Sequence, residues 1–244
     1  MNIEIIGYGI LGQAIEYALK DTYDITIIDP PKGMFGSLDE CDRYILCAPT
    51  PANDDGSCDS SLVEYYVKEI NKPLLVKSTV DPDVLIGLYK EYSFTYSPEF
   101  LREISSTADF ATQEFALFAG SNTLEWVTVL SNAGIRMDTI NSVSVEAASY
   151  AKYIINAFLA TKVTFFNEIH KHIGNQKLYD EIVDCVILDE RMGNSHMQVP
   201  GPDGELGYGG MCFPKDTNAL VHDRDLTLIQ KVIDINDDIR GKVT

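Results

Sequence analysis

Long apolar runs are missing from this sequence of 244 residues. No stretch approaches the ~18 consecutive apolar residues that a membrane-spanning helix needs. The first residues, Met1 to Glu4, enter a strand pattern at once and lack the basic and then apolar layout of a signal peptide. We therefore expect a cytoplasmic protein that makes no contact with a membrane.

Paired cysteines and basic residues are also scarce. The five cysteines are scattered and form no CxxC pair, and the four histidines show no metal-binding spacing. Neither a disulfide framework nor a metal site is therefore expected. The 19 lysines and arginines are outnumbered by 37 acidic residues, giving a formal net charge of −18. This charge argues against nucleic acid as a partner, and an anionic ligand would need local positive groups to bind.

The N-terminal segment carries a glycine-rich turn between a strand and a helix. Asn2 to Ile6 is a short apolar run typical of a buried parallel strand, and the glycine-rich residues 7–12 follow it directly. Residues 13–20 read as a helix, and residues 24–29 form a second apolar strand that ends in an acid. This order of strand, GxGxxG turn, helix and strand is the fingerprint of a dinucleotide-binding unit.

Each residue of the fingerprint has a physical task. Gly7 makes the tight turn, Gly9 lets a pyrophosphate approach the backbone, and Gly12 lets the helix pack on the strand. The pyrophosphate would lie at the helix N-terminus, where free amides favour an anion. The acid that ends the second strand can accept hydrogen bonds from a ribose diol and would repel a 2′-phosphate, which favours NAD over NADP. The predicted cofactor-binding residues here are Gly7, Gly9, Ile10, Leu11, Gly12 and Asp29.

Strands and helices continue to alternate as far as residue 143. Such alternation predicts an α/β fold with a Rossmann-type, doubly wound parallel sheet. Ligands of these sheets bind beyond the carboxyl ends of the strands, where Thr50, Thr79 and Glu99 all fall. The further strands are expected at residues 43–48, 74–77, 94–97, 115–119 and 138–143, with helices at 61–71 and 122–132.

A mainly helical region follows. Ser144 can cap a long helix that runs to about Ile173 and carries Lys152 and Asn156 four residues apart, on one face. The neighbouring residues are strongly apolar, so these two polar side chains need partners or a chemical task. The alternative is a lysine that reaches the solvent beside a hydrated asparagine. We predict two domains, an NAD-binding domain at 1–143 and a helical domain at 144–244.

The last third of the chain contains a cysteine in a glycine-rich segment. Helices are expected at residues 179–189 and 226–240, and the irregular residues 196–207 between them suggest a cover for a substrate. Cys212 follows two glycines and precedes Lys215 and Asp216. A nearby ammonium favours the thiolate, and a carboxylate can hold a water or accept a proton. A buried, inert cysteine is the alternative.

Taken together, these motifs resemble the nucleotide-sugar dehydrogenase family, and most closely its UDP-glucose branch. The resemblance covers nearly the whole chain and keeps the family's order. It rests on the glycine turn with Asp29, Ala48-Pro49-Thr50-Pro51, Ser78-Thr79-Val80, Ser97 to Glu103, Lys152 with Asn156, Arg191-Met192-Gly193, and Gly209 to Asp216.

The resemblance implies a two-step, NAD-dependent oxidation of a sugar C6 alcohol to a carboxylate, most simply UDP-glucose to UDP-glucuronate. Asp216 and a water held with Thr79 would help to remove the alcohol proton, and Cys212 would attack the aldehyde to give a thiohemiacetal. Lys152 and Asn156 would stabilise its oxyanion. Glu99 would activate the water that hydrolyses the thioester formed by the second oxidation.

The resemblance also implies ligand contacts and partners. Arg191 matches an arginine that reaches the sugar site of a neighbouring subunit, which implies a homodimer built on the long helix. Family members continue into a second Rossmann-like domain that binds much of the UDP, and no such domain follows within these 244 residues. A separate chain would then supply this lobe, or the loop before Cys212, longer than usual by several residues, would compensate, or turnover would be poor. The remaining matches to ligand-binding positions are Glu99, Phe100, Leu101, Lys152, Asn156 and Gly209 for the substrate, and Thr50, Thr79, Glu103 and Lys215 for the cofactor.

Two other functions fit parts of the sequence. A non-catalytic nucleotide-binding partner derived from such an enzyme would explain the missing lobe. A dehydrogenase of the 3-hydroxyacid or 6-phosphogluconate type would share the fold and the helix with Lys152 and Asn156, but it would have no need of Cys212.

Overall fold

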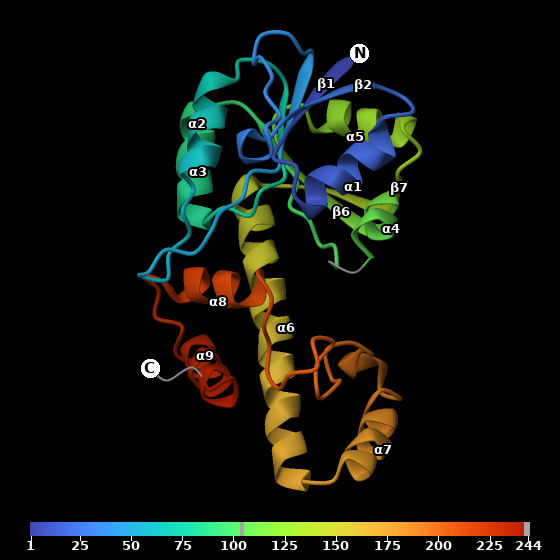
Figure 1. Cartoon of the computed structure of the whole chain (residues 1–244), viewed down its shortest axis with the longest axis vertical. Coiled ribbons are helices and arrows are strands. Elements are labelled where there is room, and N and C mark those ends of the chain that lie inside the picture. The colour runs from blue at the N-terminus through green and yellow to red at the C-terminus, as the bar shows by residue number, and fades with distance from the viewer. Residues whose placement is uncertain (103–104, 242–244) are drawn as a thin grey trace. The chain divides into compact units, whose positions relative to one another are not determined.

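The computed structural model of the chain describes residues 1–102 and 105–241 (Figure 1). These residues form two compact units. Unit 1 contains Met1–Pro51 and Cys58–Lys152, and unit 2 contains Ala52–Ser57 and the chain from Tyr153 onward. The long helix α6 (Val145–Ile173) begins in unit 1 and continues in unit 2. Each unit is described below by itself.

Unit 1 is built on one seven-stranded sheet with the order β2-β1-β3-β4-β5-β6-β7. Strand β1 lies between β2 and β3. The strand order grows to one side of β1 with β2 and to the other side with β3, so the topological switch point lies between β1 and β3. The strands are β1 (Asn2–Ile6), β2 (Asp24–Ile28), β3 (Arg43–Leu46), β4 (Leu74–Val76), β5 (Thr95–Tyr96), β6 (Thr112–Gly120) and β7 (Arg136–Val143).

The expected Rossmann-type sheet is confirmed, but β6 and β7 run antiparallel to the other strands, whereas the sequence predicted a parallel sheet throughout. β1 to β5 pair in parallel, β6 pairs antiparallel with β5, and β7 pairs in parallel with β6. The local apolar pattern that predicts a strand contains no information on its direction, which depends on its partner. Because β6 is antiparallel to β5, the connection between them starts and ends at the carboxyl-end edge of β5 and keeps residues 97–102 there.

Helices cover both faces of this sheet (Figure 1). One apolar core joins Ile6, Tyr44 and Leu46 to α2 and α3, and the other joins Ile3, Ile5 and Ile45 to α1, α4 and α5. Successive residues of a strand point to opposite faces, so the apolar runs of β1 and β3 serve both cores. The helices are α1 (Ile10–Leu19), η1 (Pro30–Lys32), α2 (Ser61–Glu69), α3 (Pro82–Glu91), α4 (Ser106–Ala111) and α5 (Thr123–Asn132).

The sequence patterns did not predict α3 and α4. At α3 the signal was nevertheless present, because the Asp81 side chain accepts a hydrogen bond from the Asp83 amide at 2.9 Å and Pro82 occupies the first helical position. The expected cap of α6 is confirmed, since Ser144 Oγ accepts a hydrogen bond from the Ala147 amide at 3.1 Å.

Unit 2 is helical. It consists of the continuation of α6, α7 (Gln176–Val186), the short η3 (Glu190–Met192), α8 (Phe213–Val221) and α9 (Thr227–Ile239). Some of its buried apolar side chains form small clusters. Phe166, Tyr179, Met197 and Val199 join α6 to α7 and the loop after η3, and Ala160, Tyr208 and Val232 join α6 to α9 and the segment before α8.

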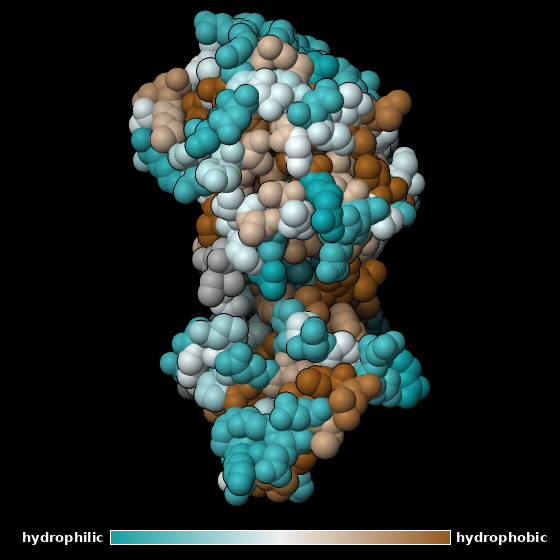
Figure 2. Space-filling model, turned by 90° about the vertical axis from the view of Figure 1, so that its right-hand side faces the viewer, coloured by the Kyte–Doolittle hydropathy of each residue, from teal (hydrophilic) through white to brown (hydrophobic). Residues whose placement is uncertain are grey.

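The exposed side chains include both polar and large apolar ones. On the face drawn in Figure 2, hydrophobic residues are interspersed with hydrophilic ones. Within residues 1–102 and 105–241, no helix has the length and apolar character that crossing a bilayer would require.

Candidate functional site

The glycine turn of unit 1 follows β1 and has a backbone that only glycine suits at its first position. Gly7 has a φ of +93°, and its amide donates to the Ile28 carbonyl at 2.8 Å. A Cβ atom at Gly7 would lie 2.5 Å from the Cys47 carbonyl oxygen, at the end of the neighbouring strand β3. The turn therefore lies at the switch point of the sheet, packed too tightly for any side chain.

The other two glycines differ in the space around them. A Cβ at Gly12 would lie 2.1 Å from the Gly7 carbonyl oxygen, so Gly12 is needed for helix α1 to pack against the turn. Nothing lies within 4 Å of a Cβ placed at Gly9. Gly9 is the N-cap of α1 and has no capping side chain, so Ile10 and Leu11 begin the helix beside open space. Backbone amides at such a helix start can bind an anion.

Asp29 lies directly after β2 and is held beside the turn. One oxygen of its carboxylate, Oδ2, accepts the Tyr8 amide at 2.8 Å. Lys32 Nζ donates to the Tyr8 carbonyl and lies 5.5 Å from the centre of the Tyr8 ring. A carboxylate held in this way keeps lone pairs for further donors, such as a ribose diol. The open helix start, the closely packed turn and this acid together fit a dinucleotide.

Thr50 and Thr79, predicted from the common rim of the sheet, are in contact. The hydroxyl of Thr50 donates to the Thr79 carbonyl oxygen at 2.7 Å, and the Thr50 side chain is buried. The hydrogen bond joins the loop after β3 to the loop after β4. It therefore fixes two loops at the carboxyl-end edge of the sheet.

Glu99 lies on the connection after β5 and forms an ion pair that the sequence did not predict. Its Oε2 atom is 2.8 Å from Nζ of Lys77, the residue that follows β4. Lys77 also donates to Ser97 Oγ at 3.3 Å. The side chain of Lys77 is 2% exposed and that of Glu99 is 12% exposed. Beside this pair, burial raises the pKa of the Cys47 thiol to about 12, so this cysteine stays protonated at neutral pH.

Lys152, Phe100 and Leu101 complete the predicted residues of unit 1. Lys152 is buried, and its Nζ lies 5.3 Å from the centre of the Phe100 ring. Leu101 is half-buried against the core that includes α1 and α5. Glu103, a predicted cofactor contact, lies outside the described residues.

In unit 2, Asn156 and Asp216 meet in a buried contact. The Asn156 amide donates from Nδ2 to Asp216 Oδ2 at 2.5 Å, and Lys215 Nζ lies 2.6 Å from the other carboxylate oxygen. Asn156 is 6% exposed and Asp216 is 1% exposed. The prediction that Asn156 needs a partner is thus met by a carboxylate that is itself neutralised by a lysine.

Cys212 is the N-cap residue of α8 and is exposed to solvent. Its carbonyl oxygen accepts the Asp216 amide at 2.8 Å, so Cys212 lies one helical turn before the Asp216 contact. The thiol is therefore accessible, and free amides at a helix start favour a negative charge. The inert, buried cysteine considered from sequence does not fit this exposure.

The backbone that leads to Cys212 is clamped by side-chain amides. Asn236, on α9 and 1% exposed, accepts the Tyr208 amide at 2.7 Å and donates to the Tyr208 carbonyl at 3.1 Å. Asn167 accepts the Gly207 amide at 2.8 Å. A Cβ at Gly209 would lie 2.8 Å from the Arg240 guanidinium, so a larger residue here would displace the end of that side chain. The sequence analysis missed these asparagines, although a polar residue at an apolar position of α9 was a signal.

Arg191 lies in η3 and is highly exposed. Its guanidinium pairs with Asp189, 2.5 Å away, and this ion pair raises the pKa of the arginine and lowers the pKa of the acid. The side chain is 88% exposed. It is therefore available to a partner molecule on the surface of unit 2.

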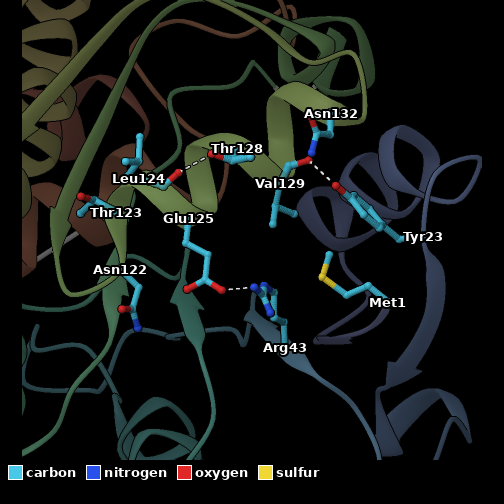
Figure 3. A pocket seen from close by; sticks show the side chains of 10 residues that line it. All are labelled: Met1, Tyr23, Arg43, Asn122, Thr123, Leu124, Glu125, Thr128, Val129 and Asn132. Atoms are coloured by element: carbon cyan, nitrogen blue, oxygen red, sulfur yellow. Dashed lines mark hydrogen bonds and ion pairs between the residues drawn. The ribbon is translucent and has the colours of Figure 1, made fainter.

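A cavity of about 760 Å³ lies at the other edge of the sheet of unit 1 (Figure 3). Met1 precedes β1, Arg43 begins β3, and Asn122 precedes α5, so the cavity lies at the amino ends of the parallel strands. Arg43 pairs with Glu125 across it, and Tyr23 donates to the Val129 carbonyl at 3.0 Å. This cavity is separate from the carboxyl-end edge that carries Gly7, Thr79 and Glu99.

Comparison with known proteins agrees with this arrangement. Residues 146–238 match the model of the central domain of the UDP-glucose/GDP-mannose dehydrogenase family. A UDP-glucose 6-dehydrogenase of Haloferax volcanii is 29% identical over 235 residues, covering 81% of this chain and 53% of the relative. The UDP-glucose 6-dehydrogenase YwqF of Bacillus subtilis is 31% identical over 228 residues, covering 82% of this chain and 49% of the relative.

The fold has a solved counterpart. The structure of a UDP-glucose dehydrogenase from Pyrobaculum islandicum matches with a TM-score of 0.79 and 23% identity, covering 97% of this chain and 68% of the other. The family-model match over residues 146–238 and the similarity to the curated relatives show that the chain belongs to the nucleotide-sugar dehydrogenase family. The fold of the solved structure agrees with this. Among the curated relatives, the matches described above are UDP-glucose 6-dehydrogenases, and the chain spans about half their length.

Proposed function

We propose that this chain catalyses the two-step oxidation of the C6 alcohol of a nucleotide sugar, with UDP-glucose as substrate and UDP-glucuronate as product. The observation that carries the proposal is the buried contact of Asn156 with Asp216, one helical turn after the exposed thiol of Cys212. A thiol, an amide donor and a carboxylate are the groups that this reaction requires. The resemblance to UDP-glucose 6-dehydrogenases supports the choice of substrate.

NAD would accept the hydride in each of the two oxidations. The residues that would hold it are the glycine turn, the amides of Ile10 and Leu11, and Asp29, with further contacts from Thr50, Thr79, Glu103 and Lys215. The proposal of NAD over NADP rests on Asp29, because its carboxylate would face the ribose and repel a 2′-phosphate.

In the first oxidation, Asp216 and a water held with Thr79 take the proton of the alcohol. The thiol of Cys212 then adds to the aldehyde carbon, and a thiohemiacetal forms. Lys152 and Asn156 stabilise the oxyanion, and loss of one such donor typically costs about 2.7–4 kcal/mol in the transition state. Asn156 already donates one of its amide hydrogens to Asp216, and its second hydrogen is the one assigned to the oxyanion.

The second oxidation leaves a thioester on Cys212. Glu99 accepts a proton from a water that attacks the thioester carbon, the carbon–sulfur bond breaks, and the sulfur leaves as the thiolate. Phe100, Leu101 and Gly209 would contact the substrate. Arg191 would reach the sugar site of a second copy of the chain, in a cytoplasmic homodimer formed through α6, and another chain or lobe would hold part of the UDP.

Turnover of the purified chain tests this proposal. With NAD and UDP-glucose we expect two NADH for each UDP-glucuronate formed, and Cys212→Ser should abolish complete turnover. Cys185→Ser is the matched control, because Cys185 is also an exposed cysteine but lies on α7. Binding of NAD in a calorimeter without NADH formation from any common sugar nucleotide would contradict the proposal and favour a non-catalytic nucleotide-binding protein.

A further inference from the structure

Lys77 is a buried charge that the proposed reaction does not yet use. It follows β4, and its amide donates to the Leu46 carbonyl at 2.9 Å, which extends the β3–β4 pairing by one residue. Ser97 extends the next pairing in the same way, through its amide and the Val76 carbonyl at 3.0 Å. Lys77 and Ser97 are therefore held by the backbone at the ends of adjacent parallel strands, close to Glu99.

The ammonium group of Lys77 is directed at defined partners. Its Nζ is 2.8 Å from Glu99 Oε2 and 3.3 Å from Ser97 Oγ, and it lies 5.8 Å from the centre of the Phe110 ring. Glu99 is held at its other oxygen as well, because Oε1 accepts the Phe100 amide at 3.2 Å. Each carboxylate oxygen of Glu99 thus has a close positive or N–H partner, with Oε2 itself buried, and 12% of the side chain as a whole is exposed.

Stability alone does not require this lysine. Taking an ammonium and a carboxylate out of water costs several kcal/mol per ion, so replacing such a pair with apolar side chains is often neutral or stabilising. The preceding residues Leu74 to Val76 are buried and apolar, so an apolar residue at 77 would continue the pattern. The pair instead lies at the carboxyl-end edge of the sheet, where ligands of this fold bind.

We infer that Lys77 is a positioning residue for thioester hydrolysis, because it holds the carboxylate of Glu99 in place to take a proton from the attacking water. This role rests on the proposed function. During the step, the water oxygen bonds to the acyl carbon, one water proton goes to Glu99, and the carbon–sulfur bond electrons return to Cys212. Lys77 neither gives nor takes a proton. The neighbouring Cys47 thiol stays neutral, so it does not compete with Glu99 for the charge of the Lys77 ammonium.

If Lys77 has this role, replacing it should slow thioester hydrolysis and leave the two oxidations nearly unchanged. In Lys77→Met, the first turnover should release its NADH at a rate close to that of the wild type. Steady-state turnover should fall about 100-fold, since misplacement of a catalytic group by about 1 Å can cost that much. The result is a burst of NADH, followed by slow turnover, with the sugar acyl group on Cys212 detectable by mass spectrometry of acid-quenched protein.

Rapid-mixing kinetics with UDP-glucose and NAD tests the inference on the whole chain. The burst amplitude counts folded sites, so the ratio of steady-state rate to burst amplitude is unaffected if Lys77→Met folds incompletely. Lys68→Met is the control, because Lys68 is an exposed lysine on α2 paired with Glu64. Adding Lys77→Met to Glu99→Gln should cause no further loss, since the carboxylate that Lys77 holds is already gone.

The outcomes are distinguishable. If the wild type turns over and Lys77→Met lowers burst and steady state equally, or changes neither, the positioning role is wrong while the proposed function stands. An additional loss in the double variant would also contradict it. If the wild type forms no NADH with any sugar nucleotide, the proposed function fails, and this inference fails with it.

Discussion

The amide of Asn156 and the carboxylate of Asp216 meet at 2.5 Å in the interior of unit 2. Asn156→Asp would place a second carboxylate at this distance, and two such groups cannot both ionise without strong repulsion. We expect the variant to lose thermal stability progressively as the pH rises above ~4, the ordinary pKa of an aspartate carboxyl. Turnover should fall about 10²–10³-fold, because an oxyanion donor has become an anion.

Thermal unfolding and NADH formation at several pH values would check this. Asn132→Asp is the control, because Asn132 is exposed at the end of α5. A variant with wild-type turnover would show that the amide of Asn156 does not act on the reacting oxygen.

A second buried acid, Glu4, lies in β1 and gives a prediction about pH. Glu4 is 1% exposed, and its Oε2 has no hydrogen-bond partner among the described residues. Burial raises the pKa of this carboxyl above 4.5, a hydrogen bond from Thr26 opposes the rise, and the charge of Glu40 adds to it. The folded state therefore binds this proton more tightly than the unfolded state, so the contribution of Glu4 to stability is lost as the pH rises above 4.5.

Glu4→Gln should accordingly be more stable than the wild type at pH 7, by about 1 kcal/mol, since a buried acceptor without a partner costs roughly 1–3 kcal/mol. The advantage should shrink at pH 4, where Glu4 is mostly protonated in both states. Urea unfolding at the two pH values measures the difference, with the exposed Glu69→Gln on α2 as control. An equal advantage at both pH values would rule out the titration of Glu4 as its cause.

At the scale of the element, substitutions in the turn between β1 and α1 should distinguish effects on folding from effects on cofactor binding. Gly7 has a positive φ and no room for a Cβ, whereas Gly9 has a negative φ of −75° and open space around it. Gly9→Ala should therefore fold with nearly wild-type stability but bind NAD at least 10-fold more weakly, because its methyl group occupies the path of the pyrophosphate. Gly7→Ala should lose both stability and binding.

Thermal unfolding without ligand and calorimetric titration with NAD distinguish the two effects. If Gly9→Ala bound NAD as tightly as the wild type, the open space above the start of α1 would not be the pyrophosphate site.

The same elements show how much the sequence predicts. The glycine turn and the acid after β2 are recognisable in the sequence because the residues that form the motif lie close together along the chain. The need of Asn156 for a partner also follows from its apolar surroundings. Its partner Asp216 does not, because the contact joins residues 60 positions apart through the packing of α8 on α6. The direction of β6 was not predictable either, since it depends on its pairing with β5.

Lys77 was missed for a related reason. In sequence it ends a short apolar strand and resembles a solvated boundary residue, and only the neighbouring strand end brings Glu99 to 2.8 Å. The charge at the end of a buried strand was a signal, but its meaning depends on tertiary structure. Sequence thus predicted the rim on which Thr50, Thr79 and Glu99 lie, but not the side-chain contacts that hold them.

At the scale of the whole molecule, the proposed homodimer can be tested through α6. This helix exposes Ile154, Phe158 and Phe165, with exposed fractions of 55%, 65% and 52%, at spacings of four and seven residues that place them on one side. Large apolar side chains gathered in this way are typical of an interface. Each copy also carries a net charge of −18, so repulsion between copies opposes association at low salt.

We expect the wild type to be a dimer in light scattering and analytical ultracentrifugation, with tighter association at higher salt. Phe158→Glu should yield a folded monomer, because the interface would then contain a buried, unpaired charge. Leu124→Glu is the matched control, since Leu124 is 78% exposed but lies on α5 of unit 1. If Arg191 completes the site of a second copy, the monomeric variant should also lose turnover at enzyme concentrations where the wild type is dimeric. A monomeric wild type at every concentration and salt, or a dimer that Phe158→Glu leaves intact, would exclude this face of α6 as the interface.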